Sequence, residues 1–442
     1  MRLIQTIKNI FKIEDLRARL IYTFGIILLY RLGKYVTLPG IDPSMLSGLK
    51  NQTSSGIMGL LDMFSGGAFS QASIFALGIM PYISASIVVQ LLGIVFPYFQ
   101  KLQKEGESGR RKMNQYTRYL TVLILILQAP TYLLNLNNIL VPEAFVSTGF
   151  FFKFSSVVIL TAGTMFVMWL GEKITDKGIG NGISLIIMIG IVARMPANFI
   201  FEAGTRMNGA GGAIALIVEI LFLFIVVLGT ILLVQGTRRV PVQYARRIIG
   251  NKQYGGVRQY IPLKVNAAGV MPIIFAQAIM MLPIIIAGYA SSGSGFVVAF
   301  SNMYGFWYNL VTAILIIVFT YFYTAITINP VQMAEDMKKN GGFIPGIKPG
   351  RKTVEFLDTI MSRITLPGSI FLAIVAILPS VAVKAQVTPQ FAQFYGGTSL
   401  LILVGVVLDT LQQIESHLLM RHYDGLMKSG RIKGRSGSVT SI

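Results

Sequence analysis

The chain has 442 residues, of which 53% are apolar, and its mean hydropathy is +0.66. This composition excludes an ordinary soluble protein, because runs such as residues 216–234 are long enough to cross a bilayer as one helix. The apolar runs do not alternate with polar residues, which argues against a membrane β-barrel. The net charge of +20 would indicate nucleic-acid binding in a soluble chain, but in a membrane protein it indicates basic cytoplasmic loops.

Cysteine is absent, and the two histidines, His417 and His422, both lie near the end of the chain. The sequence therefore offers no disulfide and no thiol chemistry, and it contains neither the HExxH motif nor a P-loop. We expect no cofactor, no bound metal and no catalytic residue.

The first 19 residues predict an amphipathic helix that lies on the cytoplasmic membrane surface. Leu3, Ile7, Ile10 and Phe11 recur at helical spacing, with basic residues between them. No small-residue cleavage site follows, so we do not interpret the segment as a cleavable signal.

Ten membrane spans follow in chain order. We place them at residues 20–38, 73–96, 117–136, 152–171, 183–200, 213–235, 266–287, 306–328, 364–383 and 397–419. The first span is the weakest because Arg31 and Lys34 interrupt it, although both side chains can reach the interface. An even number of spans puts both termini on one side of the membrane.

The distribution of basic residues orients these spans. With the N-terminus inside, 31 of the 38 Lys and Arg residues fall in inside segments and five fall outside. Positive residues concentrate in cytoplasmic loops, so we expect both termini, including the tail at 420–442, to be cytoplasmic.

Two short stretches repeat at corresponding positions of the two halves. GIMPYI occupies residues 78–83 in the second predicted span, and GVMPII occupies residues 269–274 in the seventh. Ten spans divide into two fives, at residues 20–200 and 201–419, and an odd number per half makes the halves run in opposite directions. The sequence therefore predicts an all-α membrane protein built from two inverted repeats.

The surroundings of the two Met-Pro motifs are apolar. Proline breaks helical regularity, and paired broken helices in inverted repeats mark a central pathway. Ile79, Ile83, Ile87 and Ile274 surround the breaks, so a hydrophobic constriction is one interpretation. Ordinary packing or contact with lipid explains any single isoleucine equally well, and this alternative stays open at this point.

Three further segments need an explanation. FSGGAFSQAS, at residues 64–73, is small and polar, and it is either an outside loop or a re-entrant segment that fills a cavity. Two inside loops, at about 236–265 and 329–363, are long, basic and interspersed with aromatic residues. Charge bias explains their basicity but not their length, which favours docking of a large acidic or RNA-containing partner over simple topology loops.

Six blocks of sequence closely resemble the SecY family, whose members are the pore subunits of the bacterial protein-export channel. They cover nearly the whole chain in order, and they read MFSGGAFSQASIFALGIMPYISASIVVQLL (63–92), KEGESGRRKMNQYTRY (104–119), MWLGEKITDKGIGNGIS (168–184), PLKVNAAGVMPIIFA (262–276), NGGFIPGIKPG (340–350) and YGGTSLLI (395–402). The resemblance implies a clamshell of two five-helix halves around an hourglass pore. It also implies a passive channel for secretion of unfolded preproteins and lateral insertion of membrane proteins, located in the bacterial inner membrane.

The resemblance assigns residues to each part of such a channel. The apolar pore ring would be formed by Ile79, Ile83, Ile183, Ile187, Ile274 and Ile402. The plug would span about 64–73, with Phe64, Ser65, Gly66, Gly67, Ala68, Phe69 and Ser70 at its centre. The lateral gate would lie between the second, third, seventh and eighth spans and would carry the polar residues Gln90, Gln128 and Asn266. Hydrogen bonding between helices is their simpler role, and it is compatible with a weak latch.

The same resemblance implies several partners. The motor SecA and the ribosome would dock on the two inside loops through Arg238, Arg239, Arg246, Arg247, Lys348 and Arg351. Lys348 stands where other bacterial members carry Arg, so it retains the charge but not the planar guanidinium. The small subunits SecE and SecG, signal-sequence-bearing preproteins and membrane lipid would be the other partners.

Two other classes of protein fit the spans in part. A small-solute secondary transporter also uses inverted repeats and broken helices, but it needs an intramembrane carboxylate near the breaks. The candidates Glu172, Glu219 and Asp409 do not lie beside the Met-Pro motifs in the sequence. An intramembrane enzyme is less consistent, because HExxH is absent and both histidines lie at or beyond the last span.

Overall fold

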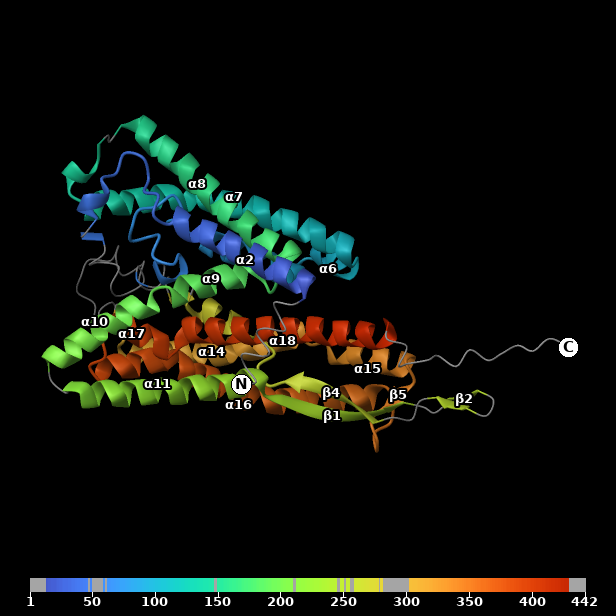
Figure 1. Ribbon diagram of the computed structural model, residues 1–442. Coiled ribbons are helices and arrows are strands. Elements are labelled where there is room, and N and C mark those ends of the chain that lie inside the picture. Colours follow the sequence, from blue (N-terminus) through green and yellow to red (C-terminus); the bar gives the residue numbers. More distant parts are fainter. Residues whose placement is uncertain are drawn as a thin grey trace.

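The computed structural model describes the chain in the ranges 13–46, 48–49, 59, 62–146, 149–209, 212–244, 247–249, 252–254, 258–277, 279–280 and 302–428. Its helices form two bodies that lie one above the other in Figure 1. The upper body contains helices from the first half of the chain, and the lower body contains those from the second half. Helices α9 and α10 lie between the bodies, where α9 packs against α18.

The helices of the first half are α2 (Glu14–Gly33), α5 (Met80–Val95), α6 (Pro97–Lys104), α7 (Glu107–Ile139), α8 (Phe150–Lys177), α9 (Gly182–Val192) and α10 (Met195–Asn208). The short 3₁₀ helices η1 (Pro43–Met45) and η2 (Pro142–Ala144) belong to its connections. The second half contains α11 (Gly212–Gln235), α14 (Phe306–Thr327), α15 (Pro330–Lys339), α16 (Arg351–Lys384), α17 (Pro389–Ala392), η3 (Gln393–Tyr395) and α18 (Gly397–Lys428). A further helical stretch covers 271–277.

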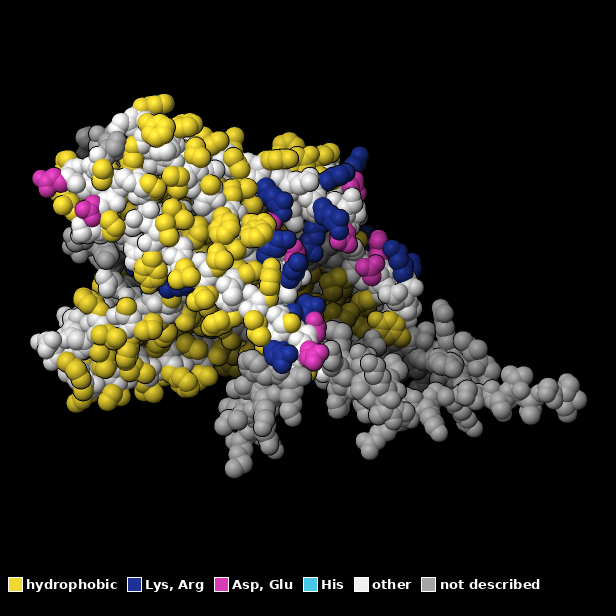
Figure 2. Space-filling view, turned by 45° about the horizontal axis from the view of Figure 1, so that its top comes forward, with side chains coloured by type: hydrophobic (Ala, Val, Ile, Leu, Met, Phe, Trp, Pro, Cys, Tyr) yellow, Lys and Arg dark blue, Asp and Glu magenta, His cyan; other side chains and the backbone are white. Residues whose placement is uncertain are grey.

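These helices are apolar on faces that no other part of the chain covers. In α11, Ile214 and Leu232 are 77% and 73% exposed, and Figure 2 shows apolar side chains over most of the visible helical surface. Several hydroxyl groups on the spans bond within their own helix: Thr230, for example, donates its hydroxyl to the carbonyl of Val226 over 2.8 Å. Such surfaces suit lipid rather than water as solvent.

The prediction of a helical membrane protein is confirmed. Among the described residues, seven helices are long and apolar enough to cross a membrane, and the bent pair α5 and α6 is an eighth candidate. The predicted seventh span, 266–287, extends outside the described residues, as does the predicted surface helix at the N-terminus. The number of ten spans therefore stays a prediction. The predicted first span, 20–38, corresponds to α2, which begins earlier and ends before Lys34.

The two Met-Pro motifs begin helices instead of interrupting them, which corrects the prediction of a helix from residue 73. Residues 65–79 form turns, and α5 begins at Met80 with Pro81 in its first turn. The second motif repeats this arrangement, since a helix begins at Met271. Gly78 and Gly269 precede these helices with φ values of 56° and 63°, a conformation that favours glycine. Proline is preferred in the first turn because its missing N–H has no intrahelical partner there.

A second repeat relates α9 to α18. Helix α9 begins with GISLII, from Gly182, and α18 begins with GTSLLI, from Gly397. Ile187 and Ile402 occupy the same position of this pattern, as Ile83 and Ile274 do in the first one. The two pairs of matched helix starts support the two-halves architecture.

The two long inside loops form one folded unit. Strands β1 (Thr237–Tyr244) and β4 (Arg258–Lys264) form an antiparallel hairpin in which Thr237 pairs with Lys264. The short strand β5 (Gly342–Phe343) from the other loop pairs with the end of β1. Strands β2 (Arg247–Ile249) and β3 (Lys252–Tyr254) form a second antiparallel pair. Val240 and Val242 of β1 are buried in one apolar cluster with Met337 of α15 and Leu357 of α16, so the loops share a core.

Candidate functional site: an apolar constriction closed by a buried loop

The centre of the molecule is an apolar cluster to which both halves contribute. Ile79, Ile187 and Ile402 are buried in it, at 1%, 5% and 7% exposure, and Ile83 and Ile183 pack against it while partly buried. Five of the six isoleucines predicted for the ring therefore come together. Val270, the residue that follows the glycine of the second Met-Pro motif, also packs against the cluster and was not identified from the sequence.

The sixth isoleucine, Ile274, is half-buried and does not belong to this cluster as the described residues form it. Its neighbour Ile273 is fully buried in a different cluster, together with Val226 of α11 and Ile316 of α14. Because the helix that carries them begins at Met271, Ile273 and Ile274 point in directions about 100° apart. The place of Ile274 in the ring therefore stays a prediction.

The loop that precedes α5 lies inside the protein. The seven residues Phe64 to Ser70 are all buried, and Phe64 and Ala68 belong to the central cluster with the isoleucines. Phe69 packs in a second cluster, against the ring of Tyr132 on α7 with centroids 4.8 Å apart. Phe391 and Tyr395 contribute to the central cluster from the second half. The loop therefore touches apolar residues of both halves.

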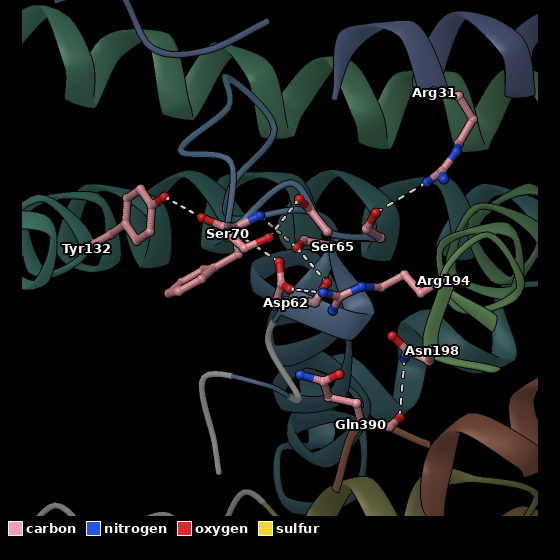
Figure 3. A network of polar contacts seen from close by, with 11 residues as sticks. Arg31, Asp62, Ser65, Ser70, Tyr132, Arg194, Asn198 and Gln390 are labelled. Carbon is pink, nitrogen blue, oxygen red and sulfur yellow. Dashed lines mark hydrogen bonds and ion pairs between the residues drawn. The ribbon is translucent and has the colours of Figure 1, made fainter. Parts of the chain in front are cut away.

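Asp62 organises the backbone of this loop (Figure 3). Its side-chain oxygen Oδ1 accepts the backbone N–H of Ser70 over 2.8 Å, and its carbonyl accepts the N–H of Gly67 and the hydroxyl of Ser65. Its other oxygen, Oδ2, forms an ion pair of 2.5 Å with Arg194, which lies between α9 and α10. Since Asp62 is fully buried, this ion pair supplies its counter-charge.

Three other side chains of the first half, from two helices, hold the loop. The hydroxyl of Tyr30 donates to the carbonyl of Ser65 over 3.1 Å, and Arg31 donates to the carbonyl of Gly66 over 3.3 Å, both from α2. Tyr132 donates its hydroxyl to the carbonyl of Phe69 over 3.0 Å. The loop has no strand or long helix to satisfy its buried backbone carbonyls, so donors from α2 and α7 satisfy them instead.

A close backbone contact explains why small residues are needed here. Gly66 and Gly67 have φ values of 66° and 87°. A Cβ added to Gly66 would lie 2.9 Å from the Cα of Gly190 in α9, and one added to Gly190 would lie 3.1 Å from the Cα of Gly66. The loop therefore rests directly on the backbone of α9, one turn beyond Ile187.

A single side-chain hydrogen bond connects α5 with α14 across the predicted lateral gate. The hydroxyl of Tyr323 donates to Oε1 of Gln90 over 3.1 Å, and Nε2 of Gln90 donates to Ser86 over 3.2 Å. The sequence predicted Gln90 but not Tyr323, because nothing in the order of residues places these helices together. Gln128 is exposed on α7, and the amide oxygen of Asn266 is buried and has no hydrogen-bond partner among the described residues.

The predicted docking residues lie on the extramembrane unit. Arg238 and Arg239 are exposed on β1, and Lys348 is exposed in the turn before α16. Arg351 is exposed too and forms an ion pair of 3.3 Å with Glu355. Arg246 lies outside the described residues, and only the backbone of Arg247 is described. Figure 2 shows Lys and Arg side chains gathered at one end of the molecule, away from most of the apolar surface.

Within the described ranges, no group of three His, Cys, Asp or Glu side chains is arranged to hold a metal ion. The constriction itself is apolar, and the polar groups around the buried loop are bonded to its backbone. This arrangement suits closure of a passage by exclusion of water rather than bond-making chemistry.

Comparison with known proteins identifies the family. The sequence model described as SecY matches residues 73–411. Protein translocase subunit SecY from Corynebacterium glutamicum is 43% identical, with 95% of this chain and 98% of that protein covered. The chain belongs to the SecY family. The protein of the same name from Halalkalibacterium halodurans is 45% identical, with 96% of this chain and all of that protein covered.

Solved structures support the SecY fold. A structure described as a protein conducting channel matches with a TM-score of 0.59 at 18% identity, over 90% of this chain and 92% of that one. Sec61 in a canine ribosome-channel complex from the endoplasmic reticulum matches with a TM-score of 0.56 at 17% identity, over the same shares. The resemblance noted in the sequence is confirmed, and the chain is a multi-pass channel subunit of a protein translocase.

Proposed function

We propose that the chain conducts unfolded preproteins across the bacterial inner membrane, and membrane proteins into it, through the apolar constriction. The observation that carries this proposal is the central cluster, in which isoleucines of both halves pack together with Phe64 and Ala68 of the buried loop. At rest, the loop is the plug and the isoleucines are the ring. A passing chain replaces these contacts with its own side chains, so the seal is maintained during transport.

Separation of the halves would open the channel toward lipid. The described contact between α5 and α14 is one hydrogen bond, whose net contribution is about 1 kcal/mol. An apolar signal sequence that enters between these helices gains more free energy from burial of its side chains than the bond contributes, since each buried CH₂ is worth about 0.8 kcal/mol. Gln90, with Tyr323, is then the latch, and Gln128 and Asn266 line the same gate.

The basic extramembrane unit would be the docking surface for the motor SecA and the ribosome. Its exposed arginines on β1 and the exposed Lys348 support this role, as does the shared core of the two loops, which presents them on a fixed frame. SecE and SecG would be the small partner subunits. The basic end seen in Figure 2 supports cytoplasmic termini, because positive residues mark the cytoplasmic side.

Reconstitution tests the proposal against the alternative of a small-solute transporter. Proteoliposomes containing this chain with SecE and SecG receive SecA, ATP and a preprotein, and protection of the preprotein from protease is measured. We expect ATP-dependent protection that is absent from liposomes lacking the chain. Accumulation of small solutes without preprotein, together with no protection of preprotein, would contradict the channel function.

A further inference from the structure

A buried ionic cluster lies where the two halves are connected. Arg206, near the end of α10, donates from Nε to Glu202 over 3.2 Å, and its Nη2 forms an ion pair with Glu219 of α11. The side chains of Glu202, Arg206 and Glu219 are 0%, 10% and 9% exposed. If both carboxyl groups were ionised, the cluster would hold one uncompensated negative charge in a buried place, which is costly.

Glu202 is surrounded by donors. Besides Nε of Arg206, it accepts the backbone N–H of Thr388 over 3.0 Å and the hydroxyl of Thr388. Thr388 lies at the start of α17, so these bonds tie α10 to the second half.

Glu219 has fewer partners. Its Oε1 forms the ion pair with Nη2 of Arg206, and apart from this guanidinium the described part of the chain supplies no donor to either of its buried side-chain oxygens. Glu202 and Glu219 therefore share one guanidinium between two buried carboxyl groups. A proton on one of the two would balance the charge.

The remaining neighbours do not supply a second positive charge. Tyr395 of η3 donates its hydroxyl to the backbone carbonyl of Glu219 over 3.0 Å. The backbone carbonyl of Ala385, the residue directly after α16, accepts a hydrogen bond from Arg206 over 3.3 Å. Arg206 lies within 4.0 Å of both carboxyl groups, and no second Lys, Arg or His from the described residues forms an ion pair with either of them. A proton on one carboxyl group would supply the missing positive charge.

We propose that the buried pair of Glu202 and Glu219 holds one proton, and that this proton stabilises the joint between α10, α11 and α17. Loss of the proton leaves two facing carboxylates with one guanidinium between them, so the joint weakens. The effect of this weakening on the opening of the two halves rests on the proposed function. The binding of the proton itself does not depend on the proposed function.

Infrared spectroscopy of the purified translocase in lipid nanodiscs tests the occupancy. A protonated carboxyl group has a carbonyl stretching band that a carboxylate lacks. We expect such a band at neutral pH in the wild-type protein, and we expect Glu219→Gln to remove it. Glu143→Gln, the same change at an exposed site, serves as the matched control and should leave the band unchanged. A wild-type spectrum without the band overturns the proposal, even if the variant fails to fold. So does a band that persists in Glu219→Gln.

Thermal unfolding of the same complex tests the linkage. A folded state that holds one more proton than the unfolded state loses stability as pH rises. The wild-type midpoint should therefore fall between about pH 6 and about pH 8 by more than that of Glu219→Gln, which needs no proton. Equal pH dependence in the two proteins would overturn the linkage. If the pH dependence of unfolding is as expected but the complex translocates no preprotein, the proposed function is refuted and the proton site is not.

Discussion

The hydroxyl of Tyr323 donates a hydrogen bond to Oε1 of Gln90 over 3.1 Å, and the two residues lie 233 positions apart in the chain. They belong to α14 and α5, one helix from each half. This bond is partly buried and neutral, so its net contribution is about 1 kcal/mol. It is strong enough to favour a closed gate and weak enough for an apolar guest to replace it.

Tyr323→Phe should make the gate easier to open. Loss of about 1 kcal/mol shifts the balance between closed and open halves by about fivefold toward open. We expect translocation of a preprotein with a weakened signal sequence to increase in the reconstituted system. Tyr321→Phe removes a hydroxyl two positions away on the same helix and should have no effect. If Gln90→Leu and Tyr323→Phe had additive effects, the two residues would not act through one bond.

Arg194→Gln should loosen the plug. Asp62 is fully buried, and removal of its ion-pair partner leaves a buried carboxylate without counter-charge, at a cost of about 3 kcal/mol. Proteoliposomes carrying the variant should leak small ions in the absence of any client. Lys153→Gln removes an exposed positive charge in the same half of the chain and is the control. A variant as tight as the wild type would show that the ion pair does not hold the plug.

Gly190→Ala should displace the plug for a steric reason. In an exposed helix, replacement of glycine by alanine stabilises by about 1 kcal/mol. At this position the new Cβ would lie 3.1 Å from the Cα of Gly66, so the loop must move away. Gly204→Ala in α10 is the matched control, because its Cβ meets nothing within 4 Å. Ion leak should rise with Gly190→Ala alone, and a rise with both variants would point to a general loss of helix packing.

Paired substitution of Arg238 and Arg239 by alanine should weaken docking of SecA or ribosomes. Both side chains are exposed, so the protein should fold normally. Binding to proteoliposomes should weaken and should depend less on salt, because fewer charge contacts are made. Arg363→Ala, on α16 and outside the hairpin, is the control substitution. Unchanged binding and unchanged salt dependence would remove the β1 arginines from the docking surface.

The order of apolar and charged residues along the chain was enough to predict a helical membrane protein, most of its helices and the correspondence between its two halves. The two Met-Pro motifs lie at matching helix starts, which supports their pairing. The first helix was wrongly expected to begin at residue 73, since hydropathy does not distinguish an apolar turn from an apolar helix. Only the positive φ of Gly78 and the place of Pro81 in the first turn show where α5 begins.

Contacts between distant segments were not predictable in the same way. Tyr323 was missed because α5 and α14 are brought together only by the fold. The pairing of Asp62 with Arg194 was missed for the same reason, since one residue precedes the plug and the other follows α9. Glu219 was noted as an intramembrane carboxylate, but its contacts with Arg206 and Tyr395 depend on the fold in the same way.

The passage of a polypeptide through the isoleucine cluster is tested most directly by crosslinking. The chain has no cysteine, so Ile83→Cys introduces the only thiol, and a preprotein with one cysteine is stalled partway across in the presence of SecA and SecE. Leu232→Cys, at a site on α11 that is 73% exposed, is the lipid-facing control. We expect a disulfide at residue 83 that requires ATP and none at residue 232. A verifiably stalled client that forms no disulfide at residue 83, or one that crosslinks equally at residue 232, would contradict the assignment of this cluster as the pore.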